Sequence, residues 1–216
     1  MSPARETGFH LVTASGILEH MFETQSLFGS GQIEFDDSFP QLRRIDLDDE
    51  AWIDYCPMWL AGDQTLFDAV VSEADWEQPI VKMYDREVRT PRLVAKVSPT
   101  VHPVIPHLVE VLSGRYGVKL DRVSAGWYRD GKDSVAFHGD RIARELPEAT
   151  VATISLGGAR TFHIKPKEGG TSHTFSLGHG DLVVMGGSCQ RTWEHSIPKA
   201  SSALPRIALM FRHGYD

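Results

Sequence analysis

The tripeptide His-Gly-Asp occurs twice in this sequence, first in VAFHGDRI and again in SLGHGDLVV. The first copy places His138 two positions before Asp140, and the second copy places His179 two positions before Asp181. In an extended strand, side chains two positions apart lie on one face about 6.6 Å apart, so such a pair can converge on a metal ion. Two ligands do not make a site, and with 10 histidines in the chain a pair of this type is expected by chance. A third ligand has to separate the two copies.

The third ligand that separates them is His195, in RTWEHSIPK. Two histidines and one carboxylate form the facial triad of non-haem Fe(II) oxygenases, which leaves coordination positions open for substrates. The chain between Asp140 and His195 is long enough for several hairpin-linked strands, whereas barely one hairpin separates Asp181 from His195. Glycines flank His179 on both sides, which favours a turn. We therefore predict the first copy and His195 as the metal site, and the second copy as a turn with a polar aspartate.

The segment RIALMFR adds a signal that does not depend on the histidines. If it is a strand, Arg206 and Arg212 share one face. The opposite face carries Ile207, Leu209 and Phe211 and is expected to pack in the core. Arginines on the inner side of a barrel need an anionic partner, and the planar guanidinium suits a carboxylate. A small dicarboxylate would supply that partner; the alternative is two surface arginines that flank an edge strand.

The elements that must position these residues change in type along the chain. One helix is expected to begin at Asp63, and a second to begin at Pro106 and end at Gly114. After residue 120, short β-rich runs separated by Gly, Pro and Asp predict a sandwich or jelly roll. Gly157 and Gly158 fit a two-residue hairpin turn between VATISL and ARTFHIK. The eight expected strands are RVSAGWY, DSVAFHGD, VATISL, RTFHIK, SHTFSL, DLVVMGG, RTWEHSI and RIALMFR.

Composition sets the broad class of the protein. A chain of 216 residues with 41% hydrophobic and 24% charged residues is typical of one globular domain. No apolar run approaches the roughly 18–20 residues that cross a bilayer, and the N-terminus lacks a basic-then-apolar signal pattern. We therefore expect a cytoplasmic protein with no membrane partner. Cys56 and Cys189 are too few for a disulfide framework.

The net charge of −7 is unevenly spread along the chain. Residues 31–54 carry eight acidic and two basic side chains. Residues 82–144 carry twelve Lys and Arg against seven Asp and Glu. This basic excess indicates either an ordinary solvated face or a surface that meets a polyanion.

Together, these residues resemble the AlkB family of Fe(II)/2-oxoglutarate-dependent dioxygenases. The resemblance covers roughly residues 80–216 and runs in order through WYRDGKDSVAFHGD, VATISLGGARTFHIKPK, LGHGDLVVMGGSCQRTWEHSIPK and PRIALMFR. Over the whole chain the similarity is greatest to an actinobacterial-type bacterial AlkB homologue. The resemblance implies an α+β, mainly β fold: a double-stranded β-helix (jelly roll) with an N-terminal helical and lid extension.

The resemblance also implies a role for each site residue. The expected Fe(II) ligands are His138, Asp140 and His195. The residues expected at the cosubstrate 2-oxoglutarate are Tyr128 and Arg206 at its distal carboxylate and Arg212 near its metal-bound end. Where the family pattern has Asn two residues before this tyrosine, the chain has Gly126, which removes a hydrogen-bond donor to 2-oxoglutarate.

The reaction implied is oxidative dealkylation of N-alkylated bases of the 1-methyladenine and 3-methylcytosine type in DNA or RNA. It would use O₂ and 2-oxoglutarate and release succinate, CO₂ and an aldehyde. The damaged base would have to leave the stack to reach the iron. Alkylated DNA or RNA is thus the expected partner, with no obligate protein partner and a monomeric chain.

The segment KMYDREVRTPRLVAKVSPTVHP occupies the place of the family's nucleotide-recognition lid. Within it, Tyr84 is a candidate for stacking on a base, with a packed lid aromatic as the alternative. Arg89 and Arg92 are candidates for binding phosphates. Arg141, directly after the metal motif, replaces an acidic residue that some relatives use against the base, so it is a further substrate-binding candidate.

The expected organisation is an acidic extension followed by one domain. Residues 1–50 are expected to be a partly ordered extension, and residues 51–216 the AlkB-like domain. Within this domain, residues 51–120 would form the helices and substrate lid, and residues 121–216 the jelly-roll core. Two other functions stay open: a 2-oxoglutarate dioxygenase that acts on a protein or small molecule, and a jelly-roll binding protein without turnover.

Overall fold

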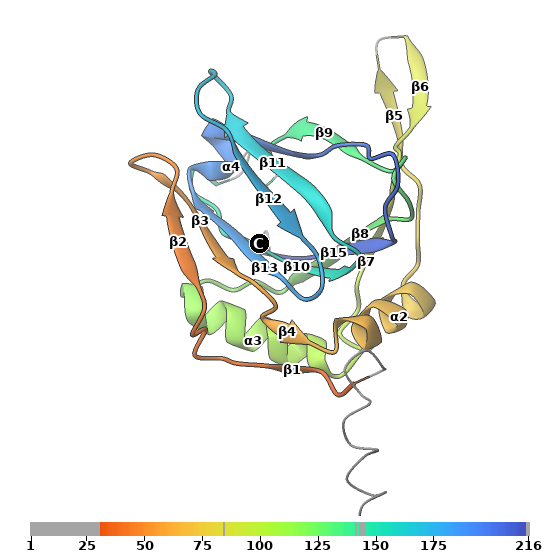
Figure 1. Ribbon diagram of the computed structural model, residues 1–216, viewed down its shortest axis with the longest axis vertical. Helices are drawn as coiled ribbons and strands as arrows, with labels where there is room; N and C mark the ends of the chain where they lie inside the picture. The colour runs from red at the N-terminus through yellow and green to blue at the C-terminus, as the bar shows by residue number, and fades with distance from the viewer. Residues whose placement is uncertain (1–30, 84, 141, 143–145, 215–216) are drawn as a thin grey trace, which may run out of the picture. The chain divides into compact units, whose positions relative to one another are not determined.

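The computed structural model describes residues 31–83, 85–140, 142 and 146–214. Residues 32–216 form one compact unit, built mainly from two antiparallel sheets (Figure 1). In spatial order, the seven-stranded major sheet contains β2 (Arg43–Asp46), β3 (Ala51–Cys56), β13 (Leu182–Gly187), β10 (Val151–Gly157), β15 (Arg206–Arg212), β8 (Arg122–Tyr128) and β7 (Leu93–Lys96). The four-stranded minor sheet contains β12 (His173–Leu177), β11 (Arg160–Pro166), β14 (Trp193–Ile197) and β9 (Val135–His138).

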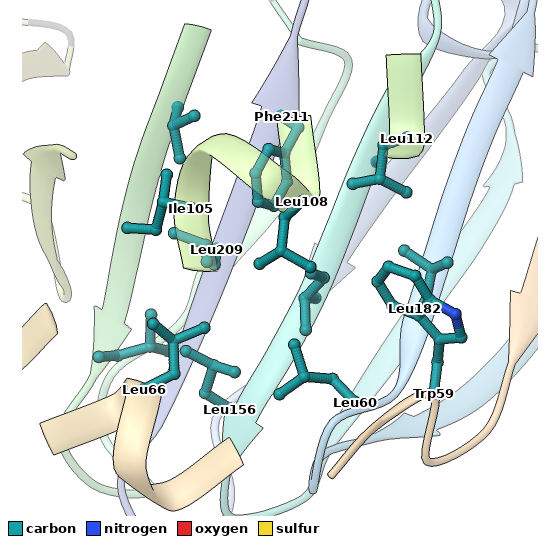
Figure 2. Packing of buried hydrophobic residues seen from close by; sticks show 14 of the residues in the cluster. Trp59, Leu60, Leu66, Ile105, Leu108, Leu112, Leu156, Leu182, Leu209 and Phe211 are labelled. Carbon is teal, nitrogen blue, oxygen red and sulfur yellow. The ribbon is translucent and has the colours of Figure 1, made fainter. Parts of the chain in front are cut away.

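Two helices cover the outer face of the major sheet. α2 (Asp63–Glu73) and α3 (Val104–Tyr116) present Leu66 and Leu108 to this face, where they meet Leu156, Leu209 and other strand residues (Figure 2). A second apolar cluster joins the inner faces of the two sheets. The central strands are buried on both faces, because one face packs against the helices and the other against the minor sheet.

Three smaller elements complete the described part of the chain. β1 (Glu34–Phe35) pairs with β4 (Leu60–Ala61) beside the helices. β5 (Ile80–Met83) and β6 (Arg86–Arg89) form a separate two-stranded hairpin that extends away from both sheets (Figure 1). We call it the lid hairpin. α4 (Cys189–Thr192) is a single helical turn directly before β14. None of the helices in the described ranges is long and apolar enough to span a bilayer.

The structure confirms the mainly β fold, the two helices and all eight strands predicted after residue 120. It also confirms the predicted faces of the last strand, since Arg206 and Arg212 point between the sheets while Phe211 packs under the helices. The expected boundary at residue 121 is wrong, because β2, β3 and β7 lie before it and belong to the major sheet. Similarly, residues 32–50, assigned to the extension, belong to the compact unit.

The predicted hairpin turn at Gly157 and Gly158 is also wrong. β10 and β11, which flank it, lie in different sheets, so this bend carries the chain from one sheet to the other. Gly157 has φ of 76°, and a Cβ on Gly158 would approach Leu204 closely. Glycine is therefore needed here for a crossover, which the local sequence does not distinguish from a hairpin.

Candidate metal centre

The two predicted histidine ligands face each other across neighbouring strands of the minor sheet. His138 ends β9 and His195 lies on β14, and the register pairs them directly. Their ring centroids are 4.4 Å apart. The Nδ1 atom of His138 lies 2.9 Å from the carbonyl oxygen of Ala136, which leaves its Nε2 directed into the site.

Asp140 completes the group from the loop directly after β9. Its Oδ1 lies 3.8 Å from Nε2 of His138 and 4.0 Å from Nε2 of His195. Its backbone N–H donates a 2.8 Å hydrogen bond to the side-chain oxygen of Gln190, on α4. Gly139 has to be glycine, because a Cβ there would collide with the backbone oxygen of Gln190. The first copy is therefore bent around α4 so that its carboxylate turns toward both histidines.

The charge states of these side chains suit a metal ion. Burial, the largest single influence, disfavours the charged form of Asp140, but Arg212 and the two histidines together outweigh it and lower the pKa of Asp140 to about 2. Burial lowers the pKa of His195 to about 3. At neutral pH the site thus offers a carboxylate and a neutral imidazole, the forms that bind a metal.

Within the described residues, this is the one group of three potential ligands that converge. Their ligand atoms all lie within 4.8 Å of one another. Two imidazole nitrogens and one carboxylate oxygen match the facial triad of non-haem Fe(II) sites, so the residues fit Fe(II).

A small chamber between the two sheets adjoins the metal group. Arg206 and Tyr128 line it together with His195 and Asp140, and its volume is about 50 Å³. Arg206 is 1% exposed, and its Nη2 donates a 2.6 Å hydrogen bond to the hydroxyl of Ser155. In the described structure its Nε and Nη1 have no hydrogen-bond partner. A buried guanidinium with two unmatched N–H groups indicates a site for an anion.

Arg206 keeps its positive charge despite this burial. Burial lowers the pKa of Arg206 to about 10, which is still far above neutral pH. A carboxylate that reached one of these unmatched N–H groups would accept a charge-assisted hydrogen bond in a place without water competition. The chamber therefore fits the distal carboxylate of 2-oxoglutarate. Tyr128 lies next to Arg206 in this chamber, and the guanidinium carbon of Arg206 is 5.6 Å from the centre of the Tyr128 ring.

Arg212 contacts the metal group directly, through Asp140. Its Nε donates a 2.9 Å hydrogen bond to Oδ2 of Asp140, and its Nη1 donates a 2.7 Å bond to the hydroxyl of Ser124. It therefore holds the ligand carboxylate in place and favours its ionised form.

A much larger open cavity also adjoins the metal group. Its volume is about 890 Å³. Lys96 and Arg122 lie on its wall and are exposed. Four residues line both this cavity and the chamber: Arg92, His138, Asp140 and Arg212. The metal group thus stands at the junction of a small anion-binding chamber and a wide opening to solvent.

The structure separates the residues that we assigned to substrate. Arg89 is exposed on β6 of the lid hairpin, where a phosphate could reach it. Arg92 instead turns inward, and its Nη1 donates a 2.7 Å hydrogen bond to the hydroxyl of Tyr128. The expected role of Arg92 as a phosphate contact stays a prediction, since Arg92 also lines the open cavity described above. Tyr84 and Arg141 lie outside the described residues.

The second His-Gly-Asp copy forms the predicted turn. His179 and Gly180 have φ of 51° and 85°, which is left-handed backbone. Asp181 accepts hydrogen bonds of 2.8 Å from the backbone N–H of Met58 and 3.1 Å from that of Gly178. This carboxylate is therefore used to join loops, not to bind a metal.

The sequence reasoning missed Gln190 and Ser155, which support the site from behind. Gln190 fixes the backbone of Asp140, and Ser155 accepts a hydrogen bond from Arg206. Gln190 carries no local signal, because its role depends on contact with a distant segment. Ser155 lies two positions after Thr153 on β10, so both side chains point to the chamber side of the strand. This spacing could have identified Ser155 from the sequence.

Comparisons with known proteins add independent findings. The model of a family described as the 2OG-Fe(II) oxygenase superfamily matches residues 65–212. The chain is 31% identical over 134 residues to alpha-ketoglutarate-dependent dioxygenase alkB homolog 3 of Homo sapiens, which covers 57% of this chain and 47% of that protein. It is 28% identical over 218 residues to DNA oxidative demethylase ALKBH2 of Arabidopsis thaliana, which covers 80% and 69%. The chain thus spans about half the length of the human relative.

Solved structures support the fold alone. The structure of OsALKBH1 superposes with a TM-score of 0.54 at 11% identity and covers 80% of this chain and 100% of that one. A prolyl hydroxylase from Trichoplax adhaerens, in complex with a hypoxia inducible factor peptide, gives a TM-score of 0.52 at 10% identity over 68% of this chain and 74% of that one.

Proposed function

We propose that the chain, a member of the AlkB family within the 2OG-Fe(II) oxygenase superfamily, acts on nucleic acids. In this proposal it removes alkyl groups oxidatively from N-alkylated bases in DNA or RNA. The reaction would consume O₂ and 2-oxoglutarate and release succinate, CO₂ and an aldehyde. One observation carries the proposal: a buried arginine with two unmatched N–H groups lies in the same chamber as a His-Asp-His group. An Fe(II) site alone would not need this arginine.

The residues of the chain divide the work between the two sheets. His138, Asp140 and His195, from the minor sheet and its loop, would hold Fe(II). Iron and 2-oxoglutarate, when bound, supply the oxidising power that activates O₂ toward the N-alkyl group. Arg206 and Tyr128, from the major sheet, would bind and orient the cosubstrate carboxylate, and burial of their chamber excludes water that would compete for these hydrogen bonds.

The open cavity supports a nucleobase as the substrate. An extruded base needs a pocket beside the reactive centre, and the cavity of about 890 Å³ reaches His138 and Asp140. The exposed Lys96 and Arg122 on its wall suit the phosphates that flank such a base. The relative from Arabidopsis thaliana is named as a DNA oxidative demethylase, which is the same chemistry.

A turnover assay tests the proposal. Succinate is measured with Fe(II) and 2-oxoglutarate, with and without a single-stranded oligonucleotide that contains 1-methyladenine or 3-methylcytosine. We expect the methylated oligonucleotide, but not its unmethylated counterpart, to raise succinate formation and to lose its methyl group. Turnover that no oligonucleotide changes would favour a protein or small-molecule substrate. Absence of succinate under every condition would contradict both enzyme functions and favour a binding protein.

We further propose that the chain acts as a monomer in the cytoplasm, as expected from the sequence. Size-exclusion chromatography with light scattering measures the first property, and a mass of twice 24.1 kDa would contradict it. Cell fractionation measures the second.

A further inference from the structure

Arg92 connects the base of the lid hairpin to the cosubstrate chamber. It lies between the end of β6 and the start of β7, and its side chain is half-buried. Its guanidinium lines both the chamber and the open cavity. Its Nη1 donates a 2.7 Å hydrogen bond to the hydroxyl oxygen of Tyr128. An arginine that was expected at the surface therefore contacts a residue expected to bind 2-oxoglutarate.

The backbone on both sides of Arg92 is fixed. The carbonyl of Pro91 accepts a 2.7 Å hydrogen bond from the N–H of Ser134, directly before β9. The N–H of Thr90 donates a 2.8 Å bond to the carbonyl of Pro79 at the start of the lid hairpin. The first bond joins the base of the lid to the segment before the strand that carries His138, and the second closes the base of the hairpin, so the backbone beside Arg92 is held by the fold.

The hydrogen bond from Arg92 determines what the Tyr128 hydroxyl can do. A phenol has one proton to donate and lone pairs that accept, whereas a guanidinium can only donate. The bond to Arg92 therefore occupies a lone pair and leaves the tyrosine proton for another acceptor. Across residues 31–83, 85–140, 142 and 146–214, no hydrogen bond donated by Tyr128 is found. Tyr128 lines the same chamber as Arg206, so an anion held in this chamber is a candidate acceptor for the tyrosine proton.

We propose that Arg92 is a positioning residue for the cosubstrate: by occupying a lone pair of the Tyr128 hydroxyl, it directs that O–H toward the carboxylate that Arg206 binds. The inference rests on the proposed use of 2-oxoglutarate and is independent of the nucleic-acid substrate. It separates two arginines that the sequence grouped together, since Arg92 acts on the cosubstrate and Arg89 stays a candidate for phosphates.

Calorimetric titration of 2-oxoglutarate into the full chain loaded with Mn(II), without nucleic acid or turnover, tests this role. We expect Arg92→Met to weaken 2-oxoglutarate binding about tenfold, the size of one charge-assisted hydrogen bond. Arg92→Lys, which keeps a donor, should recover part of the affinity. Arg89→Met, on the exposed face of the same hairpin, is the matched control and should bind 2-oxoglutarate as the unmodified chain does. Equal thermal midpoints of the variants show that each one folds.

A double variant tests whether Arg92 acts through Tyr128. If it does, Arg92→Met should cause little further loss of affinity once Tyr128→Phe has removed the hydroxyl. Independent, additive losses would overturn the inference, as would an Arg92→Met chain with unchanged affinity. Failure of the unmodified Mn(II)-loaded chain to bind 2-oxoglutarate would overturn the proposed function itself, and the inference with it, so the two failures are distinguishable.

Discussion

The two His-Gly-Asp copies have the same residues and opposite roles. In the first copy, the carboxylate of Asp140 faces two histidines and is held by Arg212. In the second copy, the carboxylate of Asp181 accepts hydrogen bonds from backbone N–H groups of Met58 and Gly178. Both aspartates are largely buried, so burial does not distinguish them. What distinguishes them is the set of neighbouring groups. One oxygen of Asp140 faces the two histidines, whereas both oxygens of Asp181 accept backbone hydrogen bonds.

The second copy still supports the site from a distance. The carbonyl of Asp181 accepts a 2.8 Å hydrogen bond from the N–H of Ser155, and the N–H of Gly180 donates a 2.7 Å bond to the carbonyl of Ser155. The hydroxyl of Ser155 in turn accepts a hydrogen bond from Arg206. One copy thus supplies metal ligands, and the other fixes the residue behind the anion-binding arginine.

Replacing the aspartate of the first copy should have the largest effect. Asp140→Asn removes the charged ligand, so we expect Mn(II) affinity to fall by at least about a hundredfold, beyond what supporting residues contribute. Calorimetric titration with Mn(II) measures this loss. The matched variant Asp181→Asn should bind Mn(II) with unchanged affinity, and an equal loss in both variants would contradict the distinction between the copies.

The next largest effect is expected from replacing Arg206, the chamber arginine whose Nε and Nη1 have no hydrogen-bond partner in the described structure. Arg206→Met should weaken 2-oxoglutarate binding about a hundredfold, because the charge-assisted contact between the buried guanidinium and the carboxylate is lost. Its Mn(II) affinity should not change. Its free energy of unfolding should not fall, since a buried and incompletely paired guanidinium is replaced by an apolar side chain. Titrations with each ligand separate the two sites, and a loss of metal binding in this variant would contradict their independence.

In the second copy the same type of substitution should act on stability. Asp181→Asn turns one carboxylate oxygen into an N–H₂ group, which cannot accept the hydrogen bond that a backbone N–H now donates. We expect the free energy of unfolding to fall by about 1–3 kcal/mol. Denaturation in urea measures it. Unchanged stability would show that this carboxylate does not join the loops.

The smallest effect is expected at the histidine of the second copy. His179 is exposed with φ of 51°, a conformation that costs less for glycine. His179→Gly should therefore raise the free energy of unfolding by at most about 1 kcal/mol, because greater freedom of the unfolded chain offsets part of the gain. Urea denaturation measures the change, and altered Mn(II) binding would be unexpected.

The sequence was informative where function depends on residue type and strand periodicity. The spacing of three ligands selected the correct copy, and alternation along RIALMFR placed Arg206 and Arg212 between the sheets. Both signals are local or need only the knowledge that strands fold back on one another. The eight strands after residue 120 follow from the same periodicity.

The parts that could not be predicted depend on which segments meet. Gly157 and Gly158 suit a hairpin and a crossover equally well, and only the pairing of β10 with β15 decides between them. Gln190 supports Asp140 only because α4 packs beside the metal loop. Arg92 resembles a surface cation in the sequence, and its inward position depends on contact with Tyr128 from β8.

The most direct test of the site is a crystal structure of the chain with Mn(II) and 2-oxoglutarate, in which anomalous scattering locates the ion. We predict one Mn(II) bound by His138, Asp140 and His195, with a carboxylate of 2-oxoglutarate on Arg206. An ion bound at the second copy, or a 2-oxoglutarate molecule that does not contact Arg206, would contradict this account.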